Sequence, residues 1–395
     1  MRLKSEILSQ TDRRRIKFLD SLNWEFEDAS TRYATHNYHP YSAKYIPQIP
    51  YYLMSTLSRK NDLILDNFMG SGTTLVESRI LGRNAIGIDI NPLACLISKV
   101  KTTAIQKSEL EKIIDISRSM KESVLKLRQL NSISLNHRTE SDIDNHLAGK
   151  IPHPNILKWF DQSAICELLL IKLRIDLIEN DNMRDFLLVA FSSILRGVSN
   201  TSSDFGNLMI NKHAPKKYKV YEKFNHRVDI MVAHMQEFSQ MIKNNSNIRI
   251  VNHDTRRLEF MGEGTVDFIC THPPYMASVP YAEYQKLSLW WLGFKPKELE
   301  NKLIGGRRSR TDTPQRFFHD MHLTLIEMKR VLCKKKYCCI IIGNPVYNRK
   351  AWELNEIIKK DAIGSGFTLL REISRRKYRL TMGKMKQEFI LIFKN

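Results

Sequence analysis

Two adjacent prolines directly after an apolar run constrain the fold of this chain more than any other feature. Residues 266–270 read VDFIC, as a buried strand would, and residues 271–275 continue as THPPY. Proline has no N–H to donate to a neighbouring strand, so the backbone must leave the sheet there in a fixed shape. The sequence therefore predicts a stiff bracket at the carboxyl edge of a β-sheet.

A bracket of this kind suits a planar ring that carries an exocyclic amine. An acceptor on His272 and the carbonyl of Pro273 would take the protons of the amine, while Tyr275 would stack on the face of the ring. The alternative is a proline pair on an edge strand, followed by a tyrosine that packs in the core. The bracket alone leaves both interpretations open.

A glycine-containing turn about two hundred residues earlier favours the first interpretation. Residues 62–66 form a short apolar run, residues 66–74 read DNFMGSGTT, and residues 75–81 have a helical pattern. A strand, a glycine turn and a helix bring a cofactor close to backbone amides at a helix N-terminus, and Gly70 and Gly72 would permit that approach. The turn is neither a phosphate-binding P-loop nor the full dinucleotide fingerprint.

A second strand, predicted within residues 83–92, ends in Asp89. A carboxylate at the tip of the second strand is where the diol of a ribose is usually bound. The alternative role for Asp89 is an N-cap of the helix that begins near Pro92.

Taken together, these motifs resemble those of the S-adenosylmethionine-dependent DNA amino-methyltransferases, which methylate adenine N6 or cytosine N4. DNFMGSGTT corresponds to the cofactor-binding motif of that family, GIDINP to its ribose-binding acid, and THPPY to its catalytic motif. The segment HNYHPYSAKYIP at residues 36–47 is similar to the N-terminal cofactor-side segment of the family.

The resemblance implies a set of site residues and S-adenosyl-L-methionine as the cofactor. The implied cofactor contacts are Tyr41, Asp66, Phe68, Gly70, Gly72, Asp89 and Asp254, and the implied catalytic residues are His272, Pro273, Pro274 and Tyr275. Asp254 follows a third predicted strand and would accept a hydrogen bond from the adenine amino group of the cofactor.

One position departs from the family pattern, which usually has Asp, Asn or Ser where this chain has His272. A neutral imidazole accepts one hydrogen bond and a protonated one accepts none, so activity should depend on pH near the ordinary histidine pKa of about 6.5.

The predicted fold is α/β: a Rossmann-like class I methyltransferase fold with a mostly parallel twisted sheet, flanking helices and a large helical insertion. Residues 1–104 would hold an N-terminal segment and the first half of the catalytic domain, and residues 246–395 its second half. Residues 105–245 would form the insertion, a candidate region for DNA or target recognition, because residues 156–177 and 183–196 repeat apolar positions at helical spacing. The resemblance also implies an antiparallel final hairpin.

The charge of the chain predicts a polyanionic partner. Lys and Arg number 62 against 42 Asp and Glu, which gives a formal net charge of +20. Such a charge attracts phosphate backbones, although a general basic bias is the alternative. The predicted DNA contacts are Arg307, Arg308 and Arg310 in one loop and Lys216 and Lys217 in another, where a solvated charge run is the alternative.

Composition also argues against several other classes of protein. The six cysteines contain no CxxC pair, which favours reduced thiols and neither a metal site nor a disulfide framework. No apolar run approaches the ~20 residues of a membrane span, and the N-terminus lacks the apolar core of a signal peptide. We therefore expect a soluble, cytoplasmic protein without a membrane partner or a metal.

The leading hypothesis is a site-specific DNA methyltransferase that acts on an exocyclic base amine in double-stranded DNA. No Pro-Cys pair occurs, which argues against a cytosine-C5 enzyme. Thr271 resembles the first residue of the TSPPY form of the cytosine-N4 enzymes, so cytosine N4 is favoured over adenine N6. An RNA methyltransferase, a protein-glutamine methyltransferase and a non-catalytic nucleic-acid-binding protein are the further alternatives. A cognate restriction endonuclease is a conceivable partner of a restriction-modification enzyme.

Overall fold

The centre of the computed structural model is a seven-stranded sheet in the order β3-β2-β1-β4-β5-β9-β8. The structure describes residues 9–42, 44–134, 151–202, 208–211, 219–276, 280–305, 312–376 and 387–395. The strands are β1 (Leu63–Asp66), β2 (Asn84–Asp89), β3 (Ile248–Asn252), β4 (Val266–Thr271), β5 (Leu332–Gly343), β8 (Thr368–Arg376) and β9 (Gln387–Lys394). A separate two-stranded ladder joins β6 (Val346–Tyr347) to β7 (Lys350–Ala351).

Strands β1 to β5 run parallel, and β9 is antiparallel between β5 and β8. Strand β1 pairs with β2 on one side and with β4 on the other. The loops after β1 and β4 therefore lead to opposite halves of the sheet, and this switch point is where open α/β sheets bind their ligands. The Rossmann-like class I methyltransferase fold and its antiparallel final hairpin are confirmed.

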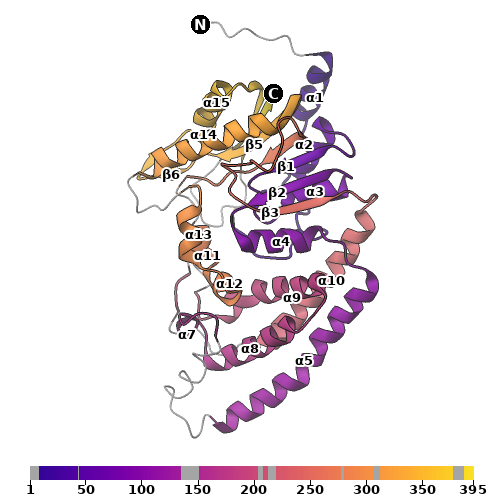
Figure 1. The fold of residues 1–395 in the computed structure, drawn as a ribbon, viewed down its shortest axis with the longest axis vertical. Helices are drawn as coiled ribbons and strands as arrows, with labels where there is room; N and C mark the ends of the chain where they lie inside the picture. The colour runs from indigo at the N-terminus through magenta and orange to yellow at the C-terminus, as the bar shows by residue number, and fades with distance from the viewer. Residues whose placement is uncertain are drawn as a thin grey trace.

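Helices cover both faces of the sheet (Figure 1). On one face, α1 (Gln10–Asp20), α2 (Gln48–Leu57) and α3 (Thr73–Ile80) pack against Ile64, Phe268 and Ile341. On the other face, α14 (Thr313–Val331) and α15 (Leu354–Gly364) pack against Leu65, Ile269 and Ile340. These sheet residues are sequence neighbours that alternate between the two faces, as the period of a strand requires.

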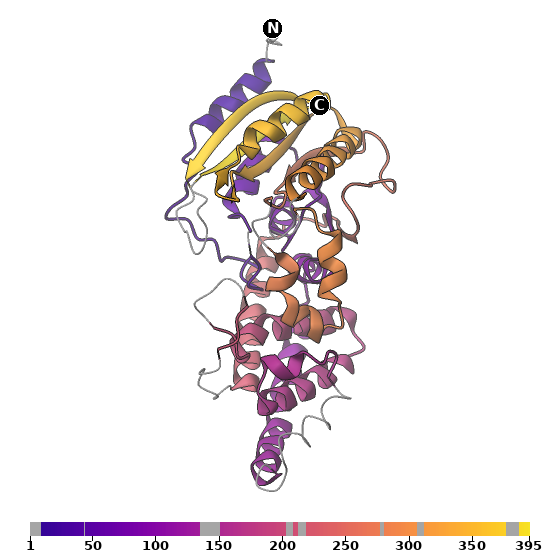
Figure 2. The ribbon, with the colours of Figure 1, turned by 90° about the vertical axis from the view of Figure 1, so that its left-hand side faces the viewer.

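The chain between β2 and β3 forms a helical part that lies beside the sheet (Figures 1 and 2). Its helices are α4 (Pro92–Thr102), α5 (Lys107–Ser134), α7 (Ile156–Trp159), α8 (Gln162–Asp176), α9 (Asp181–Ile194), the 3-10 turn η1 (Leu195–Val198) and α10 (Val220–Met241). Arg128 of α5 binds both Glu167 of α8 and Glu222 of α10, which ties these helices together.

Three short helices after β4 lie between the sheet and the helical part (Figure 2). They are α11 (Tyr281–Tyr284), α12 (Lys286–Trp291) and α13 (Pro296–Lys302). Trp291 of α12 is buried against the rings of Phe160 and Phe191, which belong to the helical part. The insertion is therefore packed on the segment that follows the THPPY bracket.

The helical pattern of residues 156–177 is interrupted in the structure. The chain is extended at Phe160 and Asp161, which separates α7 from α8. The buried ring of Phe160 lies edge-on to Trp291, with 5.9 Å between the centroids. The spacing of apolar residues does not reveal this break, because Phe160 is an apolar residue that is buried although it lies between the two helices.

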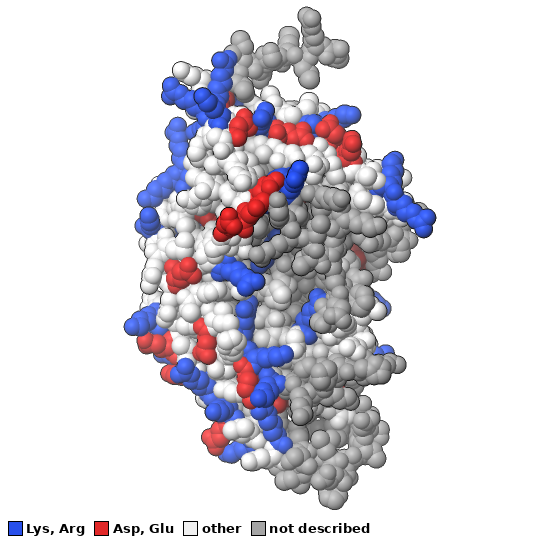
Figure 3. All heavy atoms as spheres, turned by 180° about the vertical axis from the view of Figure 1, so that it is seen from behind, with Lys and Arg blue, Asp and Glu red and all other residues white. Residues whose placement is uncertain are grey.

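Positive charge is spread widely over the surface. Figure 3 shows Lys and Arg side chains over both the sheet layer and the helical part, mixed with Asp and Glu. All six cysteines lie in the described ranges and none forms a disulfide, and burial raises the pKa of the Cys270, Cys338 and Cys339 thiols. Within the described ranges, no helix has the length and apolar character to cross a membrane, and no cluster of His, Cys, Asp or Glu could hold a metal ion.

Candidate active site

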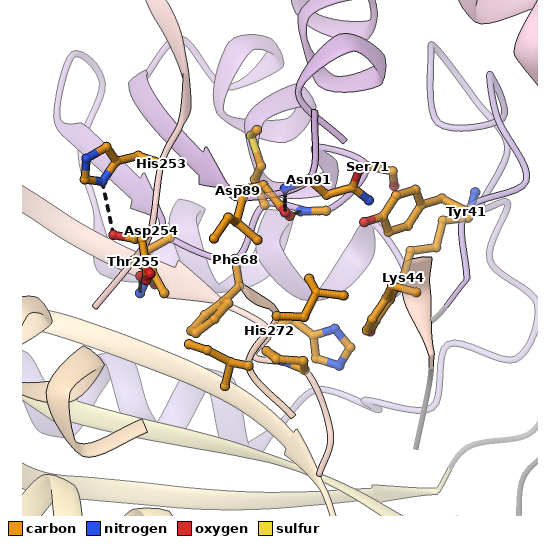
Figure 4. Close-up of a pocket in the computed structure, with 18 of the residues that line it drawn as sticks. Tyr41, Lys44, Phe68, Ser71, Asp89, Asn91, His253, Asp254, Thr255 and His272 are labelled. Carbon is orange, nitrogen blue, oxygen red and sulfur yellow. Dashed lines mark hydrogen bonds between the residues drawn. The ribbon is translucent and has the colours of Figure 1, made fainter. Parts of the chain in front are cut away.

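A pocket lies at the carboxyl ends of β1, β2 and β4. Asp89, Asn91 and Tyr41 line one part of its wall, and His253, Asp254 and Thr255 line another, with Phe68 and His272 between them (Figure 4). Of the predicted cofactor residues, Tyr41, Phe68, Gly70, Asp89 and Asp254 line this pocket. Of the predicted catalytic residues, His272 and Pro274 line it.

Gly72 packs closely on α4, and its predicted contact to a cofactor stays a prediction. Gly72 precedes α3 with a φ of +74°, which favours glycine. A Cβ at this position would lie 2.7 Å from Ser98 Oγ of α4. The missing side chain therefore makes room for α4.

Gly70 connects the turn to Asp89. Its N–H donates to Asp89 Oδ2 at 2.9 Å, and its carbonyl accepts from Ser98 Oγ at 3.0 Å. A Cβ at Gly70 would lie 3.3 Å from Tyr41 Cε1, so the turn also packs closely on the 36–47 segment.

Asp89 is held by backbone amides and faces the pocket. Oδ1 accepts from Asn91 N and Oδ2 from Gly70 N, both at 2.9 Å. Burial raises the pKa of Asp89 to about 6, although these hydrogen bonds lower it in part. Helix α4 is capped by Asn91, whose side chain accepts from Leu93 N at 3.1 Å, so the alternative that Asp89 is its N-cap is wrong.

Asp66 lies behind the turn and is not part of the pocket wall. Its carboxylate accepts from Phe68 N at 3.2 Å, from Thr271 Oγ1 at 3.0 Å and from Thr74 Oγ1. Burial raises its pKa to about 6. Asp66 thus fastens β1 to β4 and to α3, and a direct contact to a cofactor stays a prediction.

Asp254 lines the pocket as an ionised carboxylate. Burial by itself would raise its pKa, but hydrogen bonds from Arg256 hold the pKa below the ordinary value. Arg256 Nη2 lies 2.6 Å from Asp254 Oδ2, and Arg256 Nη1 lies 2.8 Å from Asp320 Oδ1 on α14. The arginine therefore fixes the carboxylate predicted to contact an adenine.

Among the described residues, two buried polar atoms at the pocket wall have no hydrogen-bond partner. They are Ser71 Oγ and Asn67 Oδ1. Buried polar groups are nearly always paired, so unpaired ones at a cavity wall suit a polar ligand. Sequence reasoning missed both residues, although they stand within the DNFMGSGTT motif.

The 36–47 segment supplies part of the wall and is itself anchored to α3. Tyr41, Lys44 and Tyr45 line the pocket, and the last two were missed. His36 Nε2 lies 2.7 Å from Glu77 Oε1 of α3, and burial raises the pKa of Glu77 to about 8.

The bracket differs from its prediction at Tyr275. His272 and Pro274 line the pocket, whereas the Tyr275 ring is buried in the apolar cluster that also includes Phe317 and Met321 of α14. Its hydroxyl lies 2.6 Å from His272 Nε2 and donates to Glu388 Oε1 at 3.0 Å. Tyr275 does not line the pocket, and its stacking on a substrate ring stays a prediction.

Behind Tyr275 stands an ion pair that sequence reasoning missed. Arg375 Nη1 lies 2.6 Å from Glu388 Oε2, and Arg375 Nε donates to Trp24 O at 2.9 Å. Both side chains are buried, on paired positions of β8 and β9. More than a hundred residues separate Glu388 from the bracket, so no local motif could reveal the contact.

The predicted DNA contacts Arg307, Arg308, Arg310, Lys216 and Lys217 lie outside the residues that the structure describes. Close to the first group in sequence, Lys302 and Ile304 line the pocket. These DNA contacts stay predictions.

The sheet order and a pocket at its switch point define the class as a Rossmann-like class I methyltransferase fold. A family model described as "DNA methylase" matches residues 5–100. The chain is 31% identical to the Type II methyltransferase M.MvaI of Kocuria varians, over 71% of this chain and 64% of that protein. It is 25% identical to the Type II methyltransferase M.MjaII of Methanocaldococcus jannaschii, over 86% of this chain and 76% of that protein.

The chain is thus similar to the DNA amino-methyltransferases, the cytosine-N4 and adenine-N6 family. Its match spans a little less than two thirds of M.MvaI, at 64% of that protein. Among solved structures, a SAM-dependent methyltransferase from Methanosarcina mazei aligns over 87% of this chain and 96% of that protein, at 10% sequence identity and a TM-score of 0.34. That score is too low to carry an argument, and the fold rests on the sheet order itself.

Proposed function

We propose that this protein transfers a methyl group from S-adenosylmethionine to an exocyclic amine of a base in double-stranded DNA. The observation that supports this most is that one pocket joins Asp89, the turn after β1 and the His272–Pro274 bracket. A cofactor site and an amine site are thereby adjacent at the switch point of the sheet.

The pocket residues fit the cofactor. Asp89 would accept from the ribose hydroxyls, Asp254 from the adenine amino group, and Ser71 Oγ and Asn67 Oδ1 would gain partners. The cofactor, when bound, would supply a methyl group on a sulfonium: the amine nitrogen would bond to the methyl carbon, the C–S electron pair would leave with the sulfur, and one amine proton would be released.

The protein's part in that transfer is positioning. His272 and the Pro273 carbonyl would accept the amine protons and hold the nitrogen lone pair towards the methyl group. The amine nitrogen is the nucleophile, so no nucleophilic side chain is needed, in agreement with the raised pKa of the buried Cys270.

Cytosine N4 is our preferred target, with adenine N6 as the alternative. The preference rests on the resemblance of Thr271 to the TSPPY form. The Thr271 hydroxyl binds Asp66 and the residue is fully buried, so Thr271 would influence the choice of base only through the shape of the bracket.

The test is labelled methyl transfer from S-adenosylmethionine to duplex DNA and, in parallel, to duplex RNA. Mass spectrometry of the digested nucleosides separates N4-methylcytosine, N6-methyladenine and C5-methylcytosine. We expect the label on a DNA amine, and its loss in His272→Ala. His322→Ala is a matched control, because His322 is half exposed on α14 and pairs with Asp361. Label on RNA alone, or on cytosine C5, would refute the proposal, and DNA binding without any label would favour the non-catalytic alternative.

A further inference from the structure

We propose that Tyr275, Glu388 and Arg375 form a relay that fixes the tautomer of His272, so that its Nδ1 is the acceptor for the substrate amine. This inference rests on the proposed function. In it, Tyr275 and Glu388 are positioning residues that act through His272.

A series of side-chain contacts connects the pocket to β9 and to the edge strand β8. His272 lies at the end of β4 with its Nε2 2.6 Å from Tyr275 Oη, and Tyr275 Oη lies 3.0 Å from Glu388 Oε1 on β9. Glu388 Oε2 lies 2.6 Å from Arg375 Nη1 on β8. All four residues are buried, with exposed fractions between 1% and 9%.

The direction of the hydrogen bonds follows from the ion pair. Glu388 is paired with Arg375, and an ionised carboxylate can only accept hydrogen bonds. Tyr275 must therefore donate its single hydroxyl proton to Glu388. Its oxygen is then the acceptor for His272, so His272 Nε2 carries the proton.

A neutral imidazole has one N–H, so a proton on Nε2 leaves Nδ1 as the acceptor of the ring. The hydrogen bond from Nε2 to Tyr275 thus makes Nδ1 the acceptor nitrogen of His272. The ring is also packed against Tyr45, with 5.1 Å between the centroids. An Asp or Asn at this position has a side-chain oxygen that always accepts. A histidine has one acceptor nitrogen, and it needs a hydrogen-bond partner to fix which nitrogen that is.

The relay also assigns the Tyr275 hydroxyl a role that differs from stacking. A phenylalanine at this position would keep the aromatic ring but could not accept from His272. Tyr275→Phe therefore separates the two roles, while Tyr275→Ala would remove both.

The experiment compares Tyr275→Phe and Glu388→Gln in two backgrounds, with His272 present and with His272→Asn. Single-turnover methyl transfer to duplex DNA is measured across pH, with cofactor affinity by calorimetry and thermal unfolding as checks on the fold. With His272 present, we expect each variant to slow transfer by about 10-fold or more, and the double variant to be no slower than the worse single one. In the His272→Asn background, we expect changes below about 2-fold, because the amide acceptor needs no relay.

Equal losses in both backgrounds would mean that Tyr275 and Glu388 act only on the structure, and would overturn the relay. A second readout does not depend on activity. The ¹⁵N chemical shifts of the His272 ring, identified by their absence in His272→Asn, should show Nε2–H in the native protein and a different tautomer ratio in Tyr275→Phe. Native shifts that show Nδ1–H would overturn the relay even if methyl transfer is observed. A protein with no methyl transfer but with Nε2–H shifts that respond to Tyr275→Phe would instead refute the proposed function.

Discussion

The two halves of the pocket are built in different ways. On the cofactor side, Asp89 is held by the amides of Asn91 and Gly70, and the turn packs on Ser98 of α4. On the bracket side, His272 depends on Tyr275, and Tyr275 on a glutamate from β9. The surroundings of Asp89 rest mainly on backbone contacts within fewer than thirty residues of chain, whereas the bracket side rests on side chains brought together by the sheet.

This difference has a consequence for how each half tolerates change. Backbone amides remain in place when a side chain is replaced, so the cofactor side should fail chiefly where its packing fails. The bracket side should lose stability or activity when any one of the hydrogen-bonded residues His272, Tyr275, Glu388 and Arg375 is replaced, because a neighbouring buried polar group then loses a partner.

The largest expected effect is on the bracket side. Arg375→Met would remove the buried guanidinium that pairs with Glu388 and should lower the free energy of unfolding by about 3–5 kcal/mol. Arg371→Met is the matched control on the same strand, because Arg371 forms an exposed ion pair with Asp20 and should cost less than about 1 kcal/mol. Urea unfolding checks both values. Equal costs for the two variants would show that burial of the Arg375 pair has no special weight.

The next effect tests packing on the cofactor side. Gly72→Ala should cost more than Gly293→Ala by about 1–3 kcal/mol, because both glycines have a positive φ but only Gly72 has a close neighbour. Thermal and urea unfolding measure the difference. If the two variants are equally stable, α4 has room to move and the assigned role of Gly72 is wrong.

A smaller effect is expected at Asp89, where the fold should persist while binding suffers. Asp89→Asn should weaken binding of S-adenosylmethionine by about 10- to 100-fold, since hydrogen bonds to a charged group contribute about 1.5–3 kcal/mol. Asp20→Asn, which alters a surface ion pair, is the control. Calorimetry that finds equal affinities in the two variants would remove Asp89 from the site.

The pKa of Asp89 also predicts a pH dependence of that binding. Because burial raises this pKa to about 6, the carboxylate is protonated below that pH and accepts fewer hydrogen bonds, so affinity should fall as pH drops through 6. The stability of the free protein should change in the other direction. Burial favours the protonated form, so the contribution of Asp89 to stability is present at low pH and is lost as pH rises through about 6. The affinity of Asp89→Asn should lack this dependence.

The smallest expected effect is on base choice. Thr271→Val removes the hydrogen bond to Asp66 and should cost about 1 kcal/mol of stability, but it should leave the methylated base unchanged. Sequencing of methylated DNA at base resolution checks the second part. A switch between cytosine N4 and adenine N6 would show that Thr271 takes part in selecting the base.

Much of the fold was predictable because its signals are local. The apolar runs that became β1, β2 and β4, the glycine turn and the acids after the strands each carry their information within a few residues. Sequence alone also identified Asp89, Asp254 and His272 as site residues, and the structure places all three at one pocket.

The chain by itself determined the order of strands and turns, the bracket of two prolines and the motifs that mark the family. The tertiary structure decided which way the side chains of those motifs point. It turned Tyr275 into the core, set Asp66 behind the turn and placed Ser98 where Gly72 lacks a side chain. Periodicity and motif spacing describe neighbours along the chain, whereas these contacts join residues that only the parallel crossovers and the final hairpin bring within hydrogen-bonding distance.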